Sequence, residues 1–182
     1  MFRTVRQLKP VGRQVRSFID VRVAQFVKVE PHPNATTLYL GTVQIGPDPA
    51  DTKQICSGLM RWYSLEELEG RKIVVVNNMK PAKLRGEKSE VMALCSELAG
   101  EQDDIQIDLL APPEGSSPGD QLVFEGHEEE IAKSVKPKKF SGLVENERLK
   151  TDKEGFVMLD GKILKDKDGN AVKSRLVDCL VR

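Results

Sequence analysis

The sequence predicts an all-β protein built on a small closed barrel, followed by a shorter α+β segment. About seven short runs of alternating or β-branched apolar residues occur before residue 126, and joints rich in glycine and proline separate them. One short helical pattern lies among these runs. Beyond residue 125 the composition changes to charged and helical patterns, so we place a domain boundary there.

The predicted strands follow one another along the chain. Residues 18–30 alternate between apolar and polar side chains, which is the period of a strand with one solvent-exposed face. The alternation changes phase near Ala24, and a β-bulge at that point would bend the strand as a small barrel requires. Further strands are expected at 38–45, 53–57, 73–76, 88–95, 105–109 and 121–124.

A short helix is expected at 64–70, between the third and fourth strands. Ser64 can cap its first turn, Glu67 completes a capping box, and Gly70 can end it in the left-handed conformation. A helix at this position in the strand order is a feature of the oligonucleotide-binding barrel known as the OB-fold. The local signals and the barrel interpretation therefore agree.

The segment after the boundary contains fewer and weaker patterns. A helix is expected at 140–149 because its apolar residues repeat at helical spacing. The pair Asp160-Gly161 favours a type I′ turn, so residues 156–164 are expected to form a hairpin. A last strand is expected at 172–181.

Composition argues against several classes of function. The formal net charge of the 182 residues is zero, so a polyanionic partner would have to be held by a local patch. Three widely separated cysteines and two histidines argue against a zinc site or a disulfide framework, and no cofactor is expected. No nucleotide-binding or catalytic motif occurs, and His32, between two prolines, is expected to be structural. Reduced thiols and the lack of a membrane-length apolar run predict a cytoplasmic protein.

The first 17 residues form a basic N-terminal extension. They contain five basic side chains and no acid, namely Arg3, Arg6, Lys9, Arg13 and Arg16. Two interpretations remain open: a solvated tail, or an arm that adds contacts to phosphate groups.

The strongest candidate for a functional site is the segment from Asn78 to Met92. It follows a β-branched strand that is predicted to be buried on both faces. Pro81 stiffens the segment and Gly86 lets it turn. It also carries four cations, Lys80, Lys83, Arg85 and Lys88. Cations and hydrogen-bonding groups in fixed positions suit a phosphate backbone better than they suit bond-making chemistry.

This segment resembles the motif N-x-K-P-x-K-x-R-G-x-x-S-x-x-M of the tRNA-binding OB-fold domain family. That family includes endothelial monocyte-activating polypeptide II and C-terminal domains of some aminoacyl-tRNA synthetases and their cofactors. The stretches 19–23, 32–39 and 111–120 agree with the family as well. The resemblance implies that tRNA is contacted by Asn78, Lys80, Lys83, Arg85, Ser89 and Met92. Val91 stands where many members have a smaller residue, and its methyl groups are expected to affect how closely RNA approaches.

The resemblance also implies an architecture. Residues 18–125 would form the OB-fold tRNA-binding domain. Residues 126–182, from near Pro137-Lys138-Lys139 onwards, would form a C-terminal subdomain like that of polypeptide II. In that branch the subdomain packs on the barrel as a pseudo-dimer partner, so a monomer is expected.

The function that the resemblance implies is a non-catalytic, largely structure-directed tRNA-binding module. It would deliver or retain tRNA for an aminoacyl-tRNA synthetase, either as a free-standing cofactor or as the C-terminal domain of a methionyl-, tyrosyl- or similar synthetase. The alternative is a protein-interaction or cytokine-like module of a multi-synthetase complex with only residual RNA binding. An enzyme would need an acid–base cleft that the sequence does not reveal.

Overall fold

The computed structural model describes residues 18–101, 104–126 and 131–182. These residues form a network of antiparallel strands with two short helices, so the prediction of a mostly β protein is confirmed. The basic extension at 1–17 lies outside the described residues.

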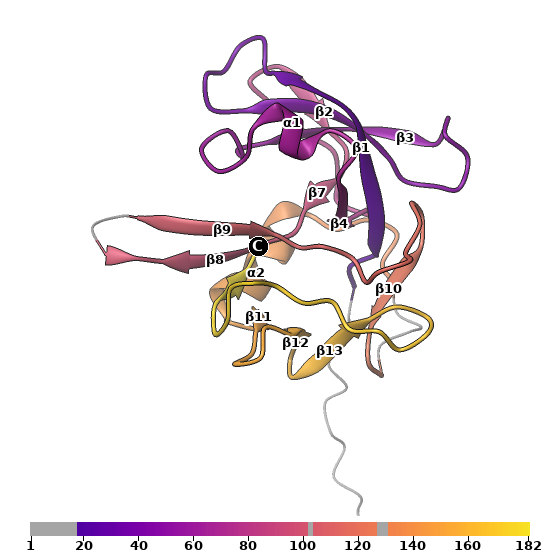
Figure 1. Ribbon diagram of the computed structural model, residues 1–182, viewed down its shortest axis with the longest axis vertical. Coiled ribbons are helices and arrows are strands. Elements are labelled where there is room, and N and C mark those ends of the chain that lie inside the picture. The colour runs from indigo at the N-terminus through magenta and orange to yellow at the C-terminus, as the bar shows by residue number, and fades with distance from the viewer. Residues whose placement is uncertain (1–17, 102–103, 127–130) are drawn as a thin grey trace, which may run out of the picture.

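The long strand β1 (Val21–Pro31) organises the sheet. It pairs antiparallel with β2 (Tyr39–Gln44), with β4 (Lys72–Val76) and with β10 (Gln121–Phe124). β3 (Thr52–Ser57) extends the sheet beyond β2. Figure 1 shows β2 and β3 near one end of β1 and β10 near its other end.

The helix α1 (Leu65–Leu68) has the caps that the sequence predicts. The Ser64 hydroxyl accepts a hydrogen bond from the Glu67 N–H at 3.3 Å, and the Glu67 carboxylate accepts one from the Ser64 N–H at 2.8 Å. Gly70 follows with a φ of 74°, in the left-handed region. The capping box and the glycine stop are both confirmed.

The predicted strand at 88–95 is wrong as a single element. The chain instead forms β6 (Glu87–Ser89), β7 (Met92–Ala93) and β8 (Cys95–Ala99) in succession. The break follows from Glu90, whose N–H bonds to the Gln54 carbonyl of β3 at 2.9 Å and so leaves the ladder. β8 then pairs with β9 (Ile105–Leu109), which was predicted.

Residues after 131 continue the same strand network. The helix α2 (Pro137–Glu145) begins three residues earlier than predicted, because a proline at its first position already has a helical φ. β11 (Leu149–Thr151), β12 (Val157–Leu159) and β13 (Lys162–Lys165) follow. β13 pairs with β10, and β12 joins β13 through the predicted hairpin.

The turn of this hairpin is the predicted one. Asp160 and Gly161 have φ values of 50° and 77°, as a type I′ turn requires. The predicted strand at 172–181 is mostly wrong, because its only strand is β14 (Leu180–Val181), which pairs with β8 and β11. Lys173 forms isolated bridges to Ala111 and Phe156. Arg175 bonds instead to a buried carboxylate, that of Asp108.

β4 separates two hydrophobic cores. Ile73 and Val75 point into the core beneath β2 and β3, whereas Val74 and Val76 point into the core that the C-terminal strands cover. None of the four side chains is accessible to solvent. The prediction of a strand buried on both faces is confirmed.

The same division explains the phase change in β1. Val21 and Val23 belong to one core, and Ala24 and Phe26 belong to the other. The register against β4 is unbroken through this stretch, so the bulge predicted near Ala24 is wrong. A register shift against β2 occurs just after Phe26 instead.

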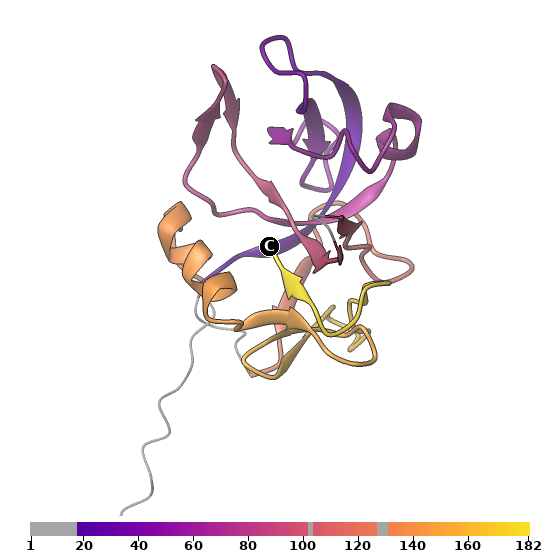
Figure 2. The same cartoon turned by 90° about the vertical axis from the view of Figure 1, so that its left-hand side faces the viewer.

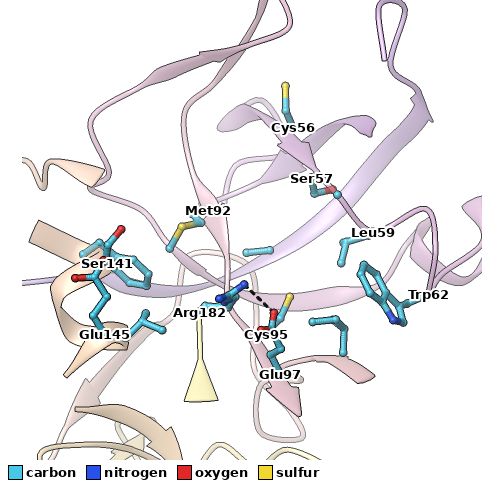
Figure 3. A pocket seen from close by; sticks show the side chains of 15 residues that line it. Cys56, Ser57, Leu59, Trp62, Met92, Cys95, Glu97, Ser141, Glu145 and Arg182 are labelled. Carbon is cyan, nitrogen blue, oxygen red and sulfur yellow. Dashed lines mark ion pairs between the residues drawn. The ribbon is translucent and has the colours of Figure 1, made fainter. Parts of the chain in front are cut away.

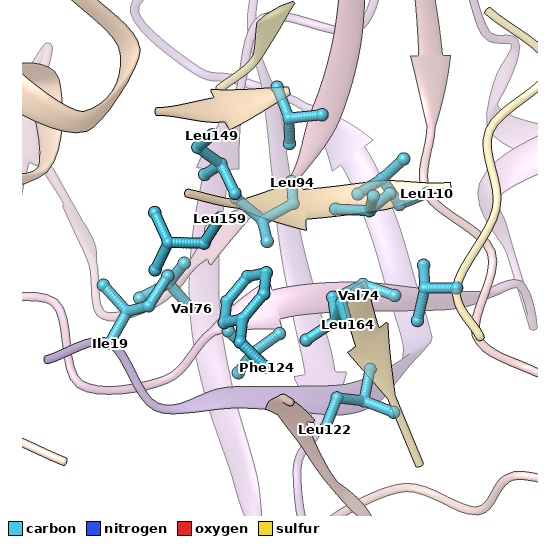
Figure 4. Close-up of a cluster of buried hydrophobic side chains, with 14 of the residues drawn as sticks. Ile19, Val74, Val76, Leu94, Leu110, Leu122, Phe124, Leu149, Leu159 and Leu164 are labelled. Carbon is cyan, nitrogen blue, oxygen red and sulfur yellow. The ribbon is translucent and has the colours of Figure 1, made fainter. Parts of the chain in front are cut away.

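The second core joins the two predicted parts of the chain. Figure 4 shows Val76 and Leu94 packed among side chains that come from the C-terminal strands, including Leu149, Leu159 and Leu164. Full burial of one such leucine contributes about 1.5–3 kcal/mol. The strands after residue 131 are therefore held by apolar burial as well as by the ladders at β10 and β8.

Candidate nucleic-acid interface

The predicted cationic loop is a two-stranded hairpin. β5 (Ala82–Leu84) pairs with β6 in a separate small sheet, and Leu84 lies opposite Glu87. The two residues between them, Arg85 and Gly86, have φ values of 51° and 99°. Two successive positive φ values define a type I′ turn, which matches the twist of the flanking strands. The Arg85 side chain is therefore carried at the tip.

A buried histidine and its neighbour hold this tip. His32 is only 4% exposed, and its Nδ1 accepts the Asn34 N–H at 3.0 Å. The opposite ring nitrogen, Nε2, therefore donates to the Leu84 carbonyl at 3.0 Å. The Asn34 amide donates to the Arg85 carbonyl at 3.4 Å. His32 is thus structural, as the sequence predicts.

The base of the hairpin is held on β3. The Ser89 hydroxyl accepts the Cys56 N–H and donates to the Val91 carbonyl, both at 3.1 Å. The Gln54 amide donates to the Lys88 carbonyl at 2.8 Å. Val91 is 3% exposed and lies in the core under β3, so the expectation that its methyl groups affect RNA approach is wrong.

Asn78 ties its own segment to two others, at residues 18–20 and at Ala132. Its Oδ1 accepts the Asp20 N–H at 2.8 Å. Its Nδ2 donates to the Phe18 carbonyl at 2.9 Å and to the Ala132 carbonyl at 2.7 Å. Both amide hydrogens are therefore used inside the protein, and the residue fixes the start of the cationic segment.

The cations of the hairpin differ in their surroundings. Lys80, Lys83 and Arg85 are exposed, and no carboxylate within the described part of the chain lies at ion-pair distance from them. Lys88 is paired with Glu90 at 2.7 Å. Two positive charges on the hairpin and one just before it therefore have no ion-pair partner among the described residues.

Met92 lies apart from these cations. It borders a cavity of about 560 Å³ between β3, β8, β9 and α2. Figure 3 shows Met92 and Trp62 on opposite sides of this cavity. The ion pair between Arg182 and Glu97, at 2.9 Å, lies between them. The six predicted residues therefore divide into an exposed cationic set, two internal supports and one cavity residue.

Sequence reasoning missed the supports of the hairpin. The hydrogen bonds of His32 and Asn34 reach across 52 and 51 residues of sequence, and that of Gln54 reaches across 34. No motif spacing encodes such contacts, because the fold alone brings these segments together. The arrangement offers anion binding at fixed points. The described residues contain no cluster suited to hold a metal ion.

A model of one protein family, described as a tRNA binding domain (tRNA_bind), matches residues 21–121, which include the whole hairpin. The chain belongs to this family. Residues 21–121 therefore form a tRNA-binding domain, which in this family is a binding unit and not a catalytic one. No helix within the described ranges is long and apolar enough to cross a membrane.

Several curated proteins are similar to this domain. The cytoplasmic tyrosine–tRNA ligase of Xenopus laevis is 40% identical over 124 residues, which are 68% of this chain and 23% of the ligase. The tRNA-aminoacylation cofactor arc1 of Schizosaccharomyces pombe is 38% identical over 126 residues, 69% of this chain and 27% of arc1. The aminoacyl tRNA synthase complex-interacting multifunctional protein 1 of Cricetulus griseus is 36% identical over 68% of this chain and 32% of its own. The tRNA-binding domain thus spans about a quarter to a third of these relatives.

One solved structure is similar over nearly the whole chain. The C-terminal domain of Plasmodium vivax p43 is 27% identical, with a TM-score of 0.78. The similarity covers 91% of this chain and 97% of that domain, so it extends well beyond residue 121.

Proposed function

We propose that this tRNA-binding domain holds tRNA for an aminoacyl-tRNA synthetase, with Lys80, Lys83 and Arg85 as its phosphate contacts. The observation that carries the proposal is three exposed cations without an ion-pair partner among the described residues, two on the hairpin and Lys80 just before it, with the hairpin fixed at both tip and base. Binding of a phosphate chain releases counterions from it, and a backbone that is already held loses little further entropy when its cations bind. Arg85 can also form two parallel hydrogen bonds to one phosphate group.

The remaining three predicted residues take different roles in this proposal. Asn78 and Ser89 place the hairpin, because their polar groups already bond within the protein. Met92 offers a soft apolar wall to one unpaired base, and the volume of its cavity lies in the range of small-ligand sites. Recognition would then depend on tRNA shape and on unpaired bases rather than on the anticodon.

We assign residues 18–125 to an OB-fold tRNA-binding domain and residues 126–182 to a subdomain like that of polypeptide II. The pairing of β13 with β10 and of β14 with β8 supports a pseudo-dimer role, because these strands occupy edges that a second copy could otherwise use. The protein would then be monomeric. Sedimentation at micromolar concentration tests this, and a dimer would contradict it.

The names of three relatives support a proposal for the partner and the location. One relative is a tRNA-aminoacylation cofactor, another is a synthetase, and a third is described as interacting with the synthetase complex. We therefore propose a synthetase as the protein partner and the cytoplasm as the location. Capture of a synthetase that persists after ribonuclease treatment would indicate direct docking, and its loss would indicate bridging by tRNA.

The test of the function is a set of filter-binding titrations at two salt concentrations with tRNA, double-stranded DNA and single-stranded RNA. We expect tRNA to bind most tightly at both concentrations, because the domain reads folded shape as well as charge. Equal affinity for DNA of the same length would contradict the proposal, since it would leave only nonspecific charge attraction.

A further inference from the structure

Two Lys-Pro pairs, far apart in sequence, lie side by side in the structure. Met79 and Val135 form a parallel bridge. The Val135 N–H donates to the Asn78 carbonyl and the Lys80 N–H donates to the Val135 carbonyl, both at 2.8 Å. The next residues on the two segments are Lys80-Pro81 and Lys136-Pro137.

The bridge fixes the side to which both lysines point. Val135 is fully buried and Met79 packs against the same core. Side chains alternate along an extended chain, and Lys136 has an extended backbone, with φ −73° and ψ 143°. Lys80 and Lys136 therefore both point away from the core, on segments about 5 Å apart.

Neither lysine has an acidic partner among the described residues. Both are exposed, and no carboxylate of the described residues is at ion-pair distance from either. The first turn of α2 contains no acid and adds the exposed Lys138. Like charges at this separation repel, and an anion bound between them relieves the repulsion. Figure 2 shows α2 and the hairpin at 82–89 on the same side of the molecule.

We propose that Lys80 and Lys136 together bind the tRNA backbone, so that the binding surface continues from the hairpin onto the segment that leads into α2. This inference rests on the proposed function and adds residues from outside the region that the family model matches. The C-terminal segment is then part of the RNA-binding surface as well as a cover for the sheet edges.

The test measures how the tRNA dissociation constant depends on salt in single variants of the full chain. Lys136→Ala should make the log–log slope less steep by about 0.7–0.9, as expected for one lost phosphate contact. Lys136→Glu should make the slope less steep by about twice as much as Lys136→Ala does, because the new carboxylate also pairs with Lys80. Lys162→Ala serves as the matched control. That lysine is exposed on β13 and has no ion pair in the described ranges, so its removal should leave the slope unchanged.

The outcomes separate this inference from the proposed function. If the double variant Lys83→Ala, Arg85→Ala has a less steep slope but Lys136→Ala does not, the inference is overturned and the function stands. If none of these variants changes the slope, the proposed site fails as well. The inference is also overturned if the control Lys162→Ala makes the slope less steep by as much as Lys136→Ala does. Circular dichroism confirms that each variant is folded.

Discussion

Replacement of Asn78 by alanine tests whether this residue holds the cationic segment in place. Its amide makes three hydrogen bonds, to Asp20, Phe18 and Ala132, at 2.7–2.9 Å. Alanine leaves one N–H and two carbonyl groups without these partners. An unsatisfied buried group costs about 1–3 kcal/mol, and these groups are only partly buried. The Phe18 carbonyl keeps the Ala132 N–H at 3.1 Å, so two groups lose their only partner. At the lower end of that range for each of the two, the free energy of unfolding should fall by about 2 kcal/mol.

Thermal unfolding followed by circular dichroism measures this loss. A decrease of about 2 kcal/mol corresponds to a fall in Tm of about 4–8 °C for a chain of this size. Asn78→Asp should be equally harmful, because a carboxylate can accept the Asp20 N–H but faces two carbonyl oxygens without hydrogens to donate. Asn146→Ala is the control, since this amide makes one exposed bond, to the Gly142 carbonyl. Its loss should cost about 0.5 kcal/mol.

An unchanged unfolding temperature of Asn78→Ala would refute this reasoning. If Asn78→Ala unfolds at the temperature of the parent, its hydrogen bonds do not support the segment. If the variant then also binds tRNA more weakly, the residue acts as a direct contact. A holding role predicts lower stability with an unchanged salt slope, because no phosphate contact is removed.

Three further predictions concern other regions. Asp108→Ala should lower the free energy of unfolding by about 3 kcal/mol in urea titrations. The reason is that the buried carboxylate accepts hydrogen bonds from both the backbone N–H and the guanidinium of Arg175, at 2.8 Å. A loss below about 1 kcal/mol would contradict this. Burial raises the pKa of the Cys95 thiol to about 12, so the thiol stays protonated at pH 8. It should therefore resist iodoacetamide until urea unfolds the chain, and mass spectrometry of the treated protein measures this. Gly58→Leu should fill part of the cavity beside Trp62, since an added Cβ would meet only one atom within 4 Å, at 3.8 Å. Its tRNA affinity should fall about tenfold with an unchanged salt slope, and parent-like affinity would show that no base enters the cavity.

Local signals in the sequence were sufficient for elements whose cause is local. Ser64 and Glu67 specify the cap of α1, and Asp160-Gly161 specifies a turn, because the groups that form each structure are within four residues of one another. The strand at 73–76 was also predictable, since its β-branched run has no polar face to expose.

Elements whose cause is tertiary could not be predicted in this way. The phase change at Ala24 looked like a bulge, but it arises because β1 passes from one core to another. Arg85 adopts a positive φ that its residue type does not favour, and contacts from the loop at 32–34 hold that turn. The role of Asn78 was hidden for the same reason, because its partners lie 54–60 residues away.

The salt dependence of tRNA binding by the variant Lys80→Ala, Lys83→Ala, Arg85→Ala tests the central claim most directly. If these three exposed cations contact phosphate groups, the log–log slope should become less steep by about 2–3 relative to the parent. The thermal stability should stay close to that of the parent, because none of the three side chains has an acidic partner within the described residues. A triple variant that binds tRNA with the affinity and the slope of the parent would contradict the assignment of the hairpin as the tRNA-binding site.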